Sequence, residues 1–132
     1  MQKSYLIVAA VFGLLSVVLG AFGAHVIKEA VPSGALEVYE TGVRYQFYHT
    51  FALLAVGMLS AWFPGKALSA SGLLFVIGIV LFSGSLYLIT WMQSTGKAVP
   101  PAVGVITPLG GLFLIAGWIL LLVALVGKKP VL

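Results

Sequence analysis

Four long apolar stretches restrict the fold of this chain more than any other feature of its sequence. They cover approximately residues 5–24, 45–63, 67–91 and 103–126. A helix needs about 20 largely apolar residues to cross the hydrocarbon core of a bilayer. Only 8% of the 132 residues are charged and 61% are hydrophobic, whereas about a quarter of a soluble domain is charged. We therefore predict an all-α integral membrane protein, a single domain of four transmembrane helices in a compact bundle.

The segment 33–44, which precedes the second stretch, has a helical pattern but is not uniformly apolar. Large apolar residues recur at helical spacing through this segment and just after it: Leu36, Tyr39, Val43 and Phe47. Glu40 and Arg44 lie on another face, four residues apart, where opposite charges can pair. We predict an amphipathic helix that starts in the membrane interface and bends or runs into the second span. Gly42 is the expected site of a bend.

Four spans place both termini on one side of the membrane. That side would carry no acidic residue but four lysines: Lys3, Lys66, Lys128 and Lys129. The other side would carry Lys28, Arg44 and Lys97 together with all three glutamates. Cytoplasmic segments are enriched in lysine and arginine. The four-to-three difference therefore favours cytoplasmic termini.

The same topology brings most of the chemically able side chains to the opposite end of the bundle. They are His25, Glu40, Arg44, Gln46, His49, Tyr87, Thr90 and Thr107. Polar and ionisable groups within a membrane are costly, so a cluster of them is a candidate functional site. All of these residues except Thr90 form our predicted ligand-binding site.

Several interpretations of this site are open. In a structural one, a Glu40–Arg44 ion pair anchors the entry helix, while Gln46 and His49 bond to neighbouring helices. In a binding one, the Arg44 guanidinium holds a phosphate or carboxylate group, and His25 and His49 add hydrogen bonds or accept a proton. Our leading prediction is a non-enzymatic bundle that binds lipid or a small ligand, or supports a membrane partner. A small-molecule or proton-coupled transporter is the alternative.

The composition offers little for catalysis or for a cofactor. The chain has no aspartate and no cysteine, which excludes a Ser-His-Asp triad and thiolate chemistry. Two histidines far apart in sequence are a weak metal signal. We expect no enzymatic activity, no cofactor and no metal, and a membrane enzyme using His and Glu is the second alternative. No basic stripe exists, so we expect membrane lipids and not nucleic acid as partners.

Small residues recur along the apolar stretches. They include Gly13, Ser16, Gly20 and Gly23 in the first, Ser83, Gly84 and Ser85 in the third, and Gly110, Gly111 and Gly117 in the fourth. Small residues allow membrane helices to approach closely. We expect packing within one chain, and the alternative is a homo-oligomer that uses these Gly/Ser faces.

Several segments resemble a known family. They are 20–25 (GAFGAH), 41–49 (TGVRYQFYH), 82–87 (FSGSLY), 106–111 (ITPLGG) and the pair Gly117-Trp118. In this order they resemble the small bacterial inner-membrane proteins of the YgdD and YwdK type. That family is a domain of unknown function, number 423, related to eukaryotic transmembrane protein 256.

The resemblance covers nearly the whole chain. It implies four membrane helices and a place in the bacterial inner (plasma) membrane, and it implies no particular biochemical activity. The chain departs from the family pattern at Val43-Arg44, before the Tyr-Gln pair. Because of this departure, Gln46 and His49 become stronger candidates than Arg44 for a role shared by the family.

Overall fold

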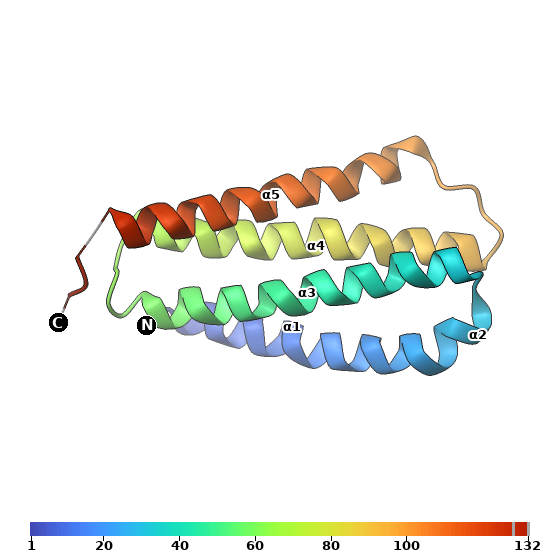
Figure 1. The fold of residues 1–132 in the computed structure, drawn as a ribbon, viewed down its shortest axis with the longest axis horizontal. Coiled ribbons are helices and arrows are strands. Elements are labelled where there is room, and N and C mark those ends of the chain that lie inside the picture. The colour runs from blue at the N-terminus through green and yellow to red at the C-terminus, as the bar shows by residue number, and fades with distance from the viewer. Residues whose placement is uncertain (128, 132) are drawn as a thin grey trace.

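The computed structural model describes residues 1–127 and 129–131, and it consists of helices joined by short connections. The elements are α1 (Lys3–Phe22), the π-helical turn η1 (Gly23–Ile27), α2 (Lys28–Ala30), α3 (Ser33–Leu59), α4 (Lys66–Ser94) and α5 (Pro101–Val126). No strand occurs within the described residues. The long helices α1, α3, α4 and α5 lie side by side in that order, with successive helices antiparallel and both termini at one end (Figure 1). The all-helical prediction is confirmed.

Proline and glycine mark several helix boundaries. α3 follows Pro32 directly, and α5 begins with Pro101, where the missing amide costs nothing because the first helical amides have no partner within the helix. Shortly after the end of α4, Gly96 has a φ of 68°, a left-handed conformation that glycine adopts without steric cost. Pro108 is different, since it lies inside α5.

α3 differs most from the sequence prediction. The segment 33–44 is the first part of α3, a helix of 27 residues that continues through Gly42, so it runs into the second stretch, which is one of the two predicted alternatives. This helix ends at Leu59 and not at the predicted residue 63. Gly42 allows a close contact: a Cβ atom there would lie 2.9 Å from the Tyr87 ring of α4. The need for space at this helix contact accounts for a glycine at this position.

Three helical segments are long and apolar enough to cross a membrane by length and composition: 3–30, 66–94 and 101–126. The first continues beyond the predicted residue 24 because η1 and α2 extend α1 to Ala30. α3 is of similar length but is not among the three. Its first half carries the polar side chains that the sequence placed in the candidate site, which lower its hydropathy.

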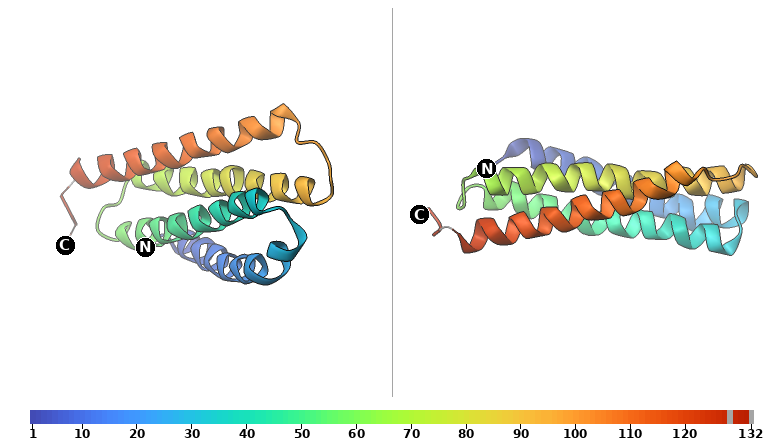
Figure 2. Two further views of the ribbon diagram at one scale, coloured as in Figure 1. Left: turned by 45° about the vertical axis from the view of Figure 1, so that its right-hand side comes forward. Right: turned by 90° about the horizontal axis from the view of Figure 1, so that it is seen from above.

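α3 and α4 form the centre of the molecule, with α1 packed on α3 and α5 packed on α4 (Figures 1 and 2). The fully buried core includes Leu53 and Val56 of α3 and Leu68 and Phe75 of α4. The backbones of α4 and α5 approach each other closely, because a Cβ atom at Gly110 would lie 2.4 Å from the Phe82 backbone nitrogen. The prediction that small residues pack helices within one chain is therefore confirmed at this contact.

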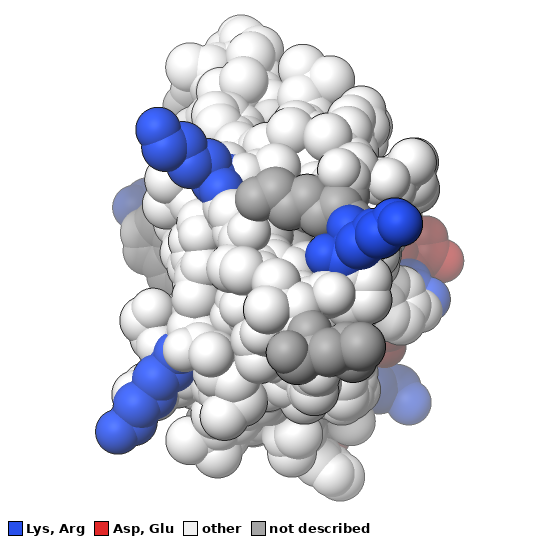
Figure 3. Space-filling view, turned by 90° about the vertical axis from the view of Figure 1, so that its left-hand side faces the viewer, with Lys and Arg blue, Asp and Glu red and all other residues white. Residues whose placement is uncertain are grey.

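Lysines surround the end that holds both termini. Lys3 and Lys66 begin α1 and α4, and Lys129 follows α5. Figure 3 looks onto this end, where basic side chains stand around a surface that is otherwise largely uncharged. Lys128, which also entered the orientation prediction, lies outside the described residues. The backbone amide of Val131 donates to the Trp62 carbonyl at 2.8 Å, which ties the C-terminal segment to the α3–α4 connection.

Candidate functional site

Gln46 connects three helices. It lies in α3 with only 4% of its surface exposed. Its Nε2 atom donates to the Phe12 carbonyl of α1 at 3.0 Å, and its Oε1 atom accepts from the Tyr87 hydroxyl of α4 at 2.8 Å. Thr50 in turn donates to the Gln46 carbonyl at 2.8 Å. Both polar atoms of the amide are therefore occupied by neighbouring helices.

Hydroxyl groups make further contacts between helices. Ser83 of α4 donates to the Gly42 carbonyl of α3 at 2.6 Å. Thr107 of α5 lies 2.6 Å from the Ser85 hydroxyl of α4. Ser71 of α4 donates to the Gly117 carbonyl of α5 at 2.7 Å. The sequence prediction included Thr107 but did not identify these serines as polar contacts. A small hydroxyl residue within an apolar helix could have indicated such contacts.

His49 of α3 forms a contact with α5. The Trp118 indole nitrogen lies 3.1 Å from His49 Nε2. An indole N–H can only donate, so Nε2 must be the acceptor and the ring proton lies on Nδ1. That nitrogen is 2.7 Å from the Tyr45 carbonyl and donates to it. The geometry thus assigns a neutral His49 whose two ring nitrogens are both used.

A shallow aromatic hollow of about 450 Å³ surrounds this pair. Tyr45 and His49 of α3, Phe82 of α4, and Leu114 and Trp118 of α5 contribute to its lining. The Tyr45 and Phe82 ring centroids lie 4.7 Å apart. The imidazole and indole polar groups bond to each other, so the hollow offers mainly apolar surface.

Glu40 and Arg44 do not form the predicted ion pair. Both side chains are exposed on α3. The Arg44 guanidinium instead contacts the Thr41 hydroxyl at 3.5 Å. That single long hydrogen bond on an exposed side chain leaves most of the guanidinium donors available.

A groove runs between α1 and α3 beside Arg44. It consists of two adjoining hollows of about 180 and 240 Å³, both lined by Gly20, Val43 and Arg44. The first is completed by Gly23, Tyr39 and Glu40, and the second by Ser16, Val17, Phe47 and Tyr48. We call these residues together the α1–α3 groove. Glycine, serine and valine line the side formed by α1 and η1, and charged and aromatic residues together with Val43 line the α3 side.

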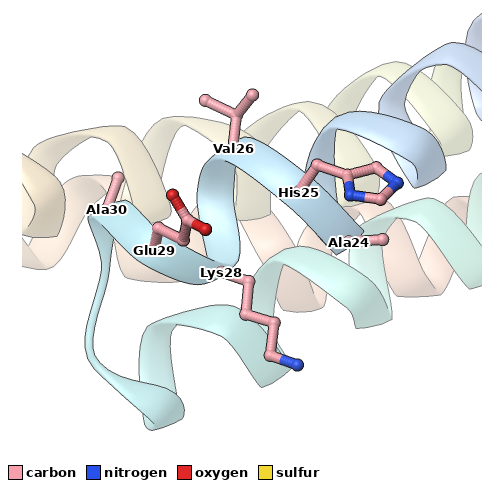
Figure 4. Close-up of a pocket in the computed structure, with 6 residues that line it drawn as sticks. All are labelled: Ala24, His25, Val26, Lys28, Glu29 and Ala30. Carbon is pink, nitrogen blue, oxygen red and sulfur yellow. The ribbon is translucent and has the colours of Figure 1, made fainter.

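His25 lies apart from the other predicted site residues. It is exposed in the π-helical turn η1, beside an open hollow of about 760 Å³ lined by residues 24–26 and 28–30. In Figure 4 the side chains of His25, Lys28 and Glu29 point in different directions. They do not converge on one point, although π-helical turns are often found at functional positions.

The structure therefore divides the predicted site into three places. Gln46, His49, Tyr87 and Thr107 make contacts between helices, Glu40 and Arg44 face the α1–α3 groove, and His25 is in neither group. Among the described residues, every buried side-chain nitrogen and oxygen has a hydrogen-bond partner. The interior is thus polar but internally satisfied.

Residues 19–111 match the family described as Protein of unknown function (DUF423). The chain belongs to this family. The matched region includes the α3–α4 contacts around Gln46 and nearly all of the α1–α3 groove. No solved structure matches the chain.

Relatives of this family match over almost their full length. The chain is 42% identical to the UPF0382 membrane protein YwdK of Bacillus subtilis, covering 95% of this chain and 98% of that protein. It is 39% identical to the UPF0382 inner membrane protein YgdD of Escherichia coli, covering 97% and 93%. A UPF0382 membrane protein of Haemophilus influenzae is 40% identical, with 90% of each chain covered. Together with the three apolar helical segments, these relatives identify the chain as an integral membrane protein.

Proposed function

We propose that the chain is a non-enzymatic membrane protein that binds a lipid in the α1–α3 groove, with Arg44 holding the lipid phosphate. The single observation that carries this proposal is the position of Arg44. It is exposed, has no carboxylate partner among the described residues, and lies at the edge of a groove with largely apolar walls. A guanidinium in such a setting favours an anionic oxygen ligand because it can bond bidentately to phosphate.

The length of α3 supports a position of Arg44 near the lipid headgroups. We propose that all four long helices cross the membrane. The apolar part of α3 after Arg44, residues 45–59, has roughly 15 residues and a length of about 22 Å at 1.5 Å per residue. The hydrocarbon core is about 30 Å thick. We propose that the span gains about five further residues at its N-terminal end, which brings Glu40 and Arg44 to the core boundary.

The walls of the groove suit the other part of a lipid. Beyond Arg44 toward the centre of α3, the lining is formed by Val17, Phe47 and Tyr48 with Ser16 and Gly20. Such a surface can hold an acyl chain by close packing. We place Arg44 at the periplasmic side of a bacterial inner membrane, with both termini cytoplasmic, in accordance with the lysine distribution.

The interior argues for this surface site over a carrier or an enzyme. A transport path needs polar atoms that can exchange partners with a substrate or proton along the bundle. Here the buried polar atoms of the described residues are already bonded to protein groups. His49, the obvious proton carrier or base, has both nitrogens engaged by Trp118 and Tyr45. We therefore assign these residues a structural role.

Native mass spectrometry of the protein in a mild detergent tests the proposal. We expect the wild type to retain phospholipid in a saturable manner and Arg44→Gln to lose most of it. The matched control is Lys97→Gln, which removes a positive charge near the same end but outside the groove. Equal retention of phospholipid by the wild type and Arg44→Gln would refute the proposal.

A further inference from the structure

The α1–α3 groove presents two opposite charges that do not neutralise each other directly. Glu40 and Arg44 line the same hollow, lie one turn apart on α3, and are both exposed. No ion pair joins them, and Arg44 bonds only to Thr41 among the described residues. The groove is therefore a place where a cation and an anion can be bound together.

We propose that the groove selects a zwitterionic phospholipid that carries a primary ammonium group, the phosphatidylethanolamine class. This inference rests on the lipid-binding function proposed above and names the headgroup. The phosphate would pair with the Arg44 guanidinium and the ammonium with the Glu40 carboxylate. Both contacts are charge-assisted hydrogen bonds, which are stronger than neutral ones.

The order of residues along α3 matches the order of groups along such a lipid. α3 enters the membrane from its N-terminal end, so Glu40 lies about 6 Å closer to the surface than Arg44 at 1.5 Å per residue. Phe47 lies deeper by a further three positions. From the bilayer centre outward, the groove thus offers an apolar ring, then a cation, then an anion. The lipid offers an acyl chain, then a phosphate, then an ammonium.

The same arrangement disfavours other headgroups. A phosphatidylglycerol phosphate could pair with Arg44, but its glycerol headgroup has no cation for Glu40, so that carboxylate would lie unpaired beside a lipid of net negative charge. Phosphatidylcholine carries a cation, but its nitrogen is fully methylated and has no N–H to donate. Selectivity would therefore arise from an unfavourable contact as well as from favourable ones.

Tyr39 does not compete for the headgroup. Its hydroxyl donates to the Leu19 carbonyl of α1, across the hollow that contains Glu40. A Cβ atom at Gly23 would lie only 2.7 Å from the Tyr39 ring. The close packing of this ring on η1, with its hydrogen bond to α1, holds that side of the hollow in place and leaves Glu40 and Arg44 as its charged groups.

A competition experiment by native mass spectrometry tests the inference. Detergent-solubilised protein is mixed with equal amounts of phosphatidylethanolamine, phosphatidylglycerol and phosphatidylcholine that have the same acyl chains. We expect the wild type to retain phosphatidylethanolamine several-fold over each of the others. Glu40→Gln should remove most of the preference over phosphatidylglycerol. Glu37→Gln, which alters an exposed acid outside the groove, should leave the preference unchanged.

The outcomes separate this inference from the proposed function. If the wild type prefers phosphatidylglycerol or shows no preference, while Arg44→Gln still loses lipid, the headgroup assignment is wrong and lipid binding at Arg44 stands. An unchanged preference in Glu40→Gln also overturns the assignment. Retention of all three lipids that is independent of Arg44 overturns both proposals. The wild-type ratio decides the matter even if a variant does not fold.

Discussion

Replacing Gln46 by leucine should destabilise the protein, because the amide side chain joins α1, α3 and α4. The substitution removes two hydrogen bonds between helices, to the Phe12 carbonyl and from the Tyr87 hydroxyl. Such bonds in membrane proteins contribute about 0.6 kcal/mol on average and up to about 1.7 kcal/mol. Phe12 keeps the bond from Ser16, whereas Tyr87 loses its acceptor at Gln46. We expect a loss of about 1–3 kcal/mol in the free energy of unfolding.

Reversible unfolding in mixed detergent and SDS micelles, followed by circular dichroism, measures this loss. The matched control is Gln93→Leu, the same substitution at an exposed position of α4, which should change stability little. A double-mutant cycle with Tyr87→Phe isolates the pair, since the two losses should be less than additive. If Gln46→Leu is as stable as Gln93→Leu, the reasoning that Gln46 holds the helices together is wrong.

Three further predictions concern the other contacts and the topology. His49→Leu and Trp118→Phe should each destabilise the protein, and a double-mutant cycle should give a coupling of about 0.6–1.7 kcal/mol; fully additive effects would contradict the hydrogen bond between them. Gly110→Ala should lower the free energy of unfolding by about 1–3 kcal/mol, because α4 and α5 must separate to make room for the methyl group. Gly104→Ala, which places a methyl group in open space, should not lower it. Equal effects of the two substitutions would refute the close contact. A cysteine at Lys129 should resist an impermeant thiol reagent in intact cells and react after permeabilisation, and labelling of intact cells would contradict cytoplasmic termini.

The helices were predictable because long apolar stretches leave few alternatives in a membrane. Topology alone predicted that polar residues gather toward one end, but it did not predict their division into three places. The boundaries of α3 were harder, since its first half is neither apolar nor a loop. The sequence suggested a bend at Gly42, but a glycine inside a helix can also serve a close contact, and here it makes room for the Tyr87 ring.

The division of the candidate site could not be read from residue types. In a soluble protein, polar residues mark the outside of a helix. In a membrane both faces of α3 carry apolar residues, so the direction of each polar side chain depends on its helix neighbours. Gln46, His49 and Leu53 share the buried face, whereas Arg44 and Phe47 lie on the exposed one. The helical spacing of Gln46, His49 and Leu53 could have indicated their common face. The hydrogen-bond partners Phe12, Tyr87 and Trp118 could be identified only from the packing of the helices.

The most direct test of the lipid groove is to map where a lipid contacts the protein. A phospholipid with a photoreactive acyl chain can be cross-linked to the protein in bilayers, and the modified residues identified by mass spectrometry. We expect adducts to concentrate on groove residues such as Val17, Val43 and Phe47, to saturate, and to decrease in Arg44→Gln. Labelling spread evenly over the exposed apolar residues, including Ile115 and Leu122 of α5, and unaffected by that substitution would contradict a lipid site between α1 and α3.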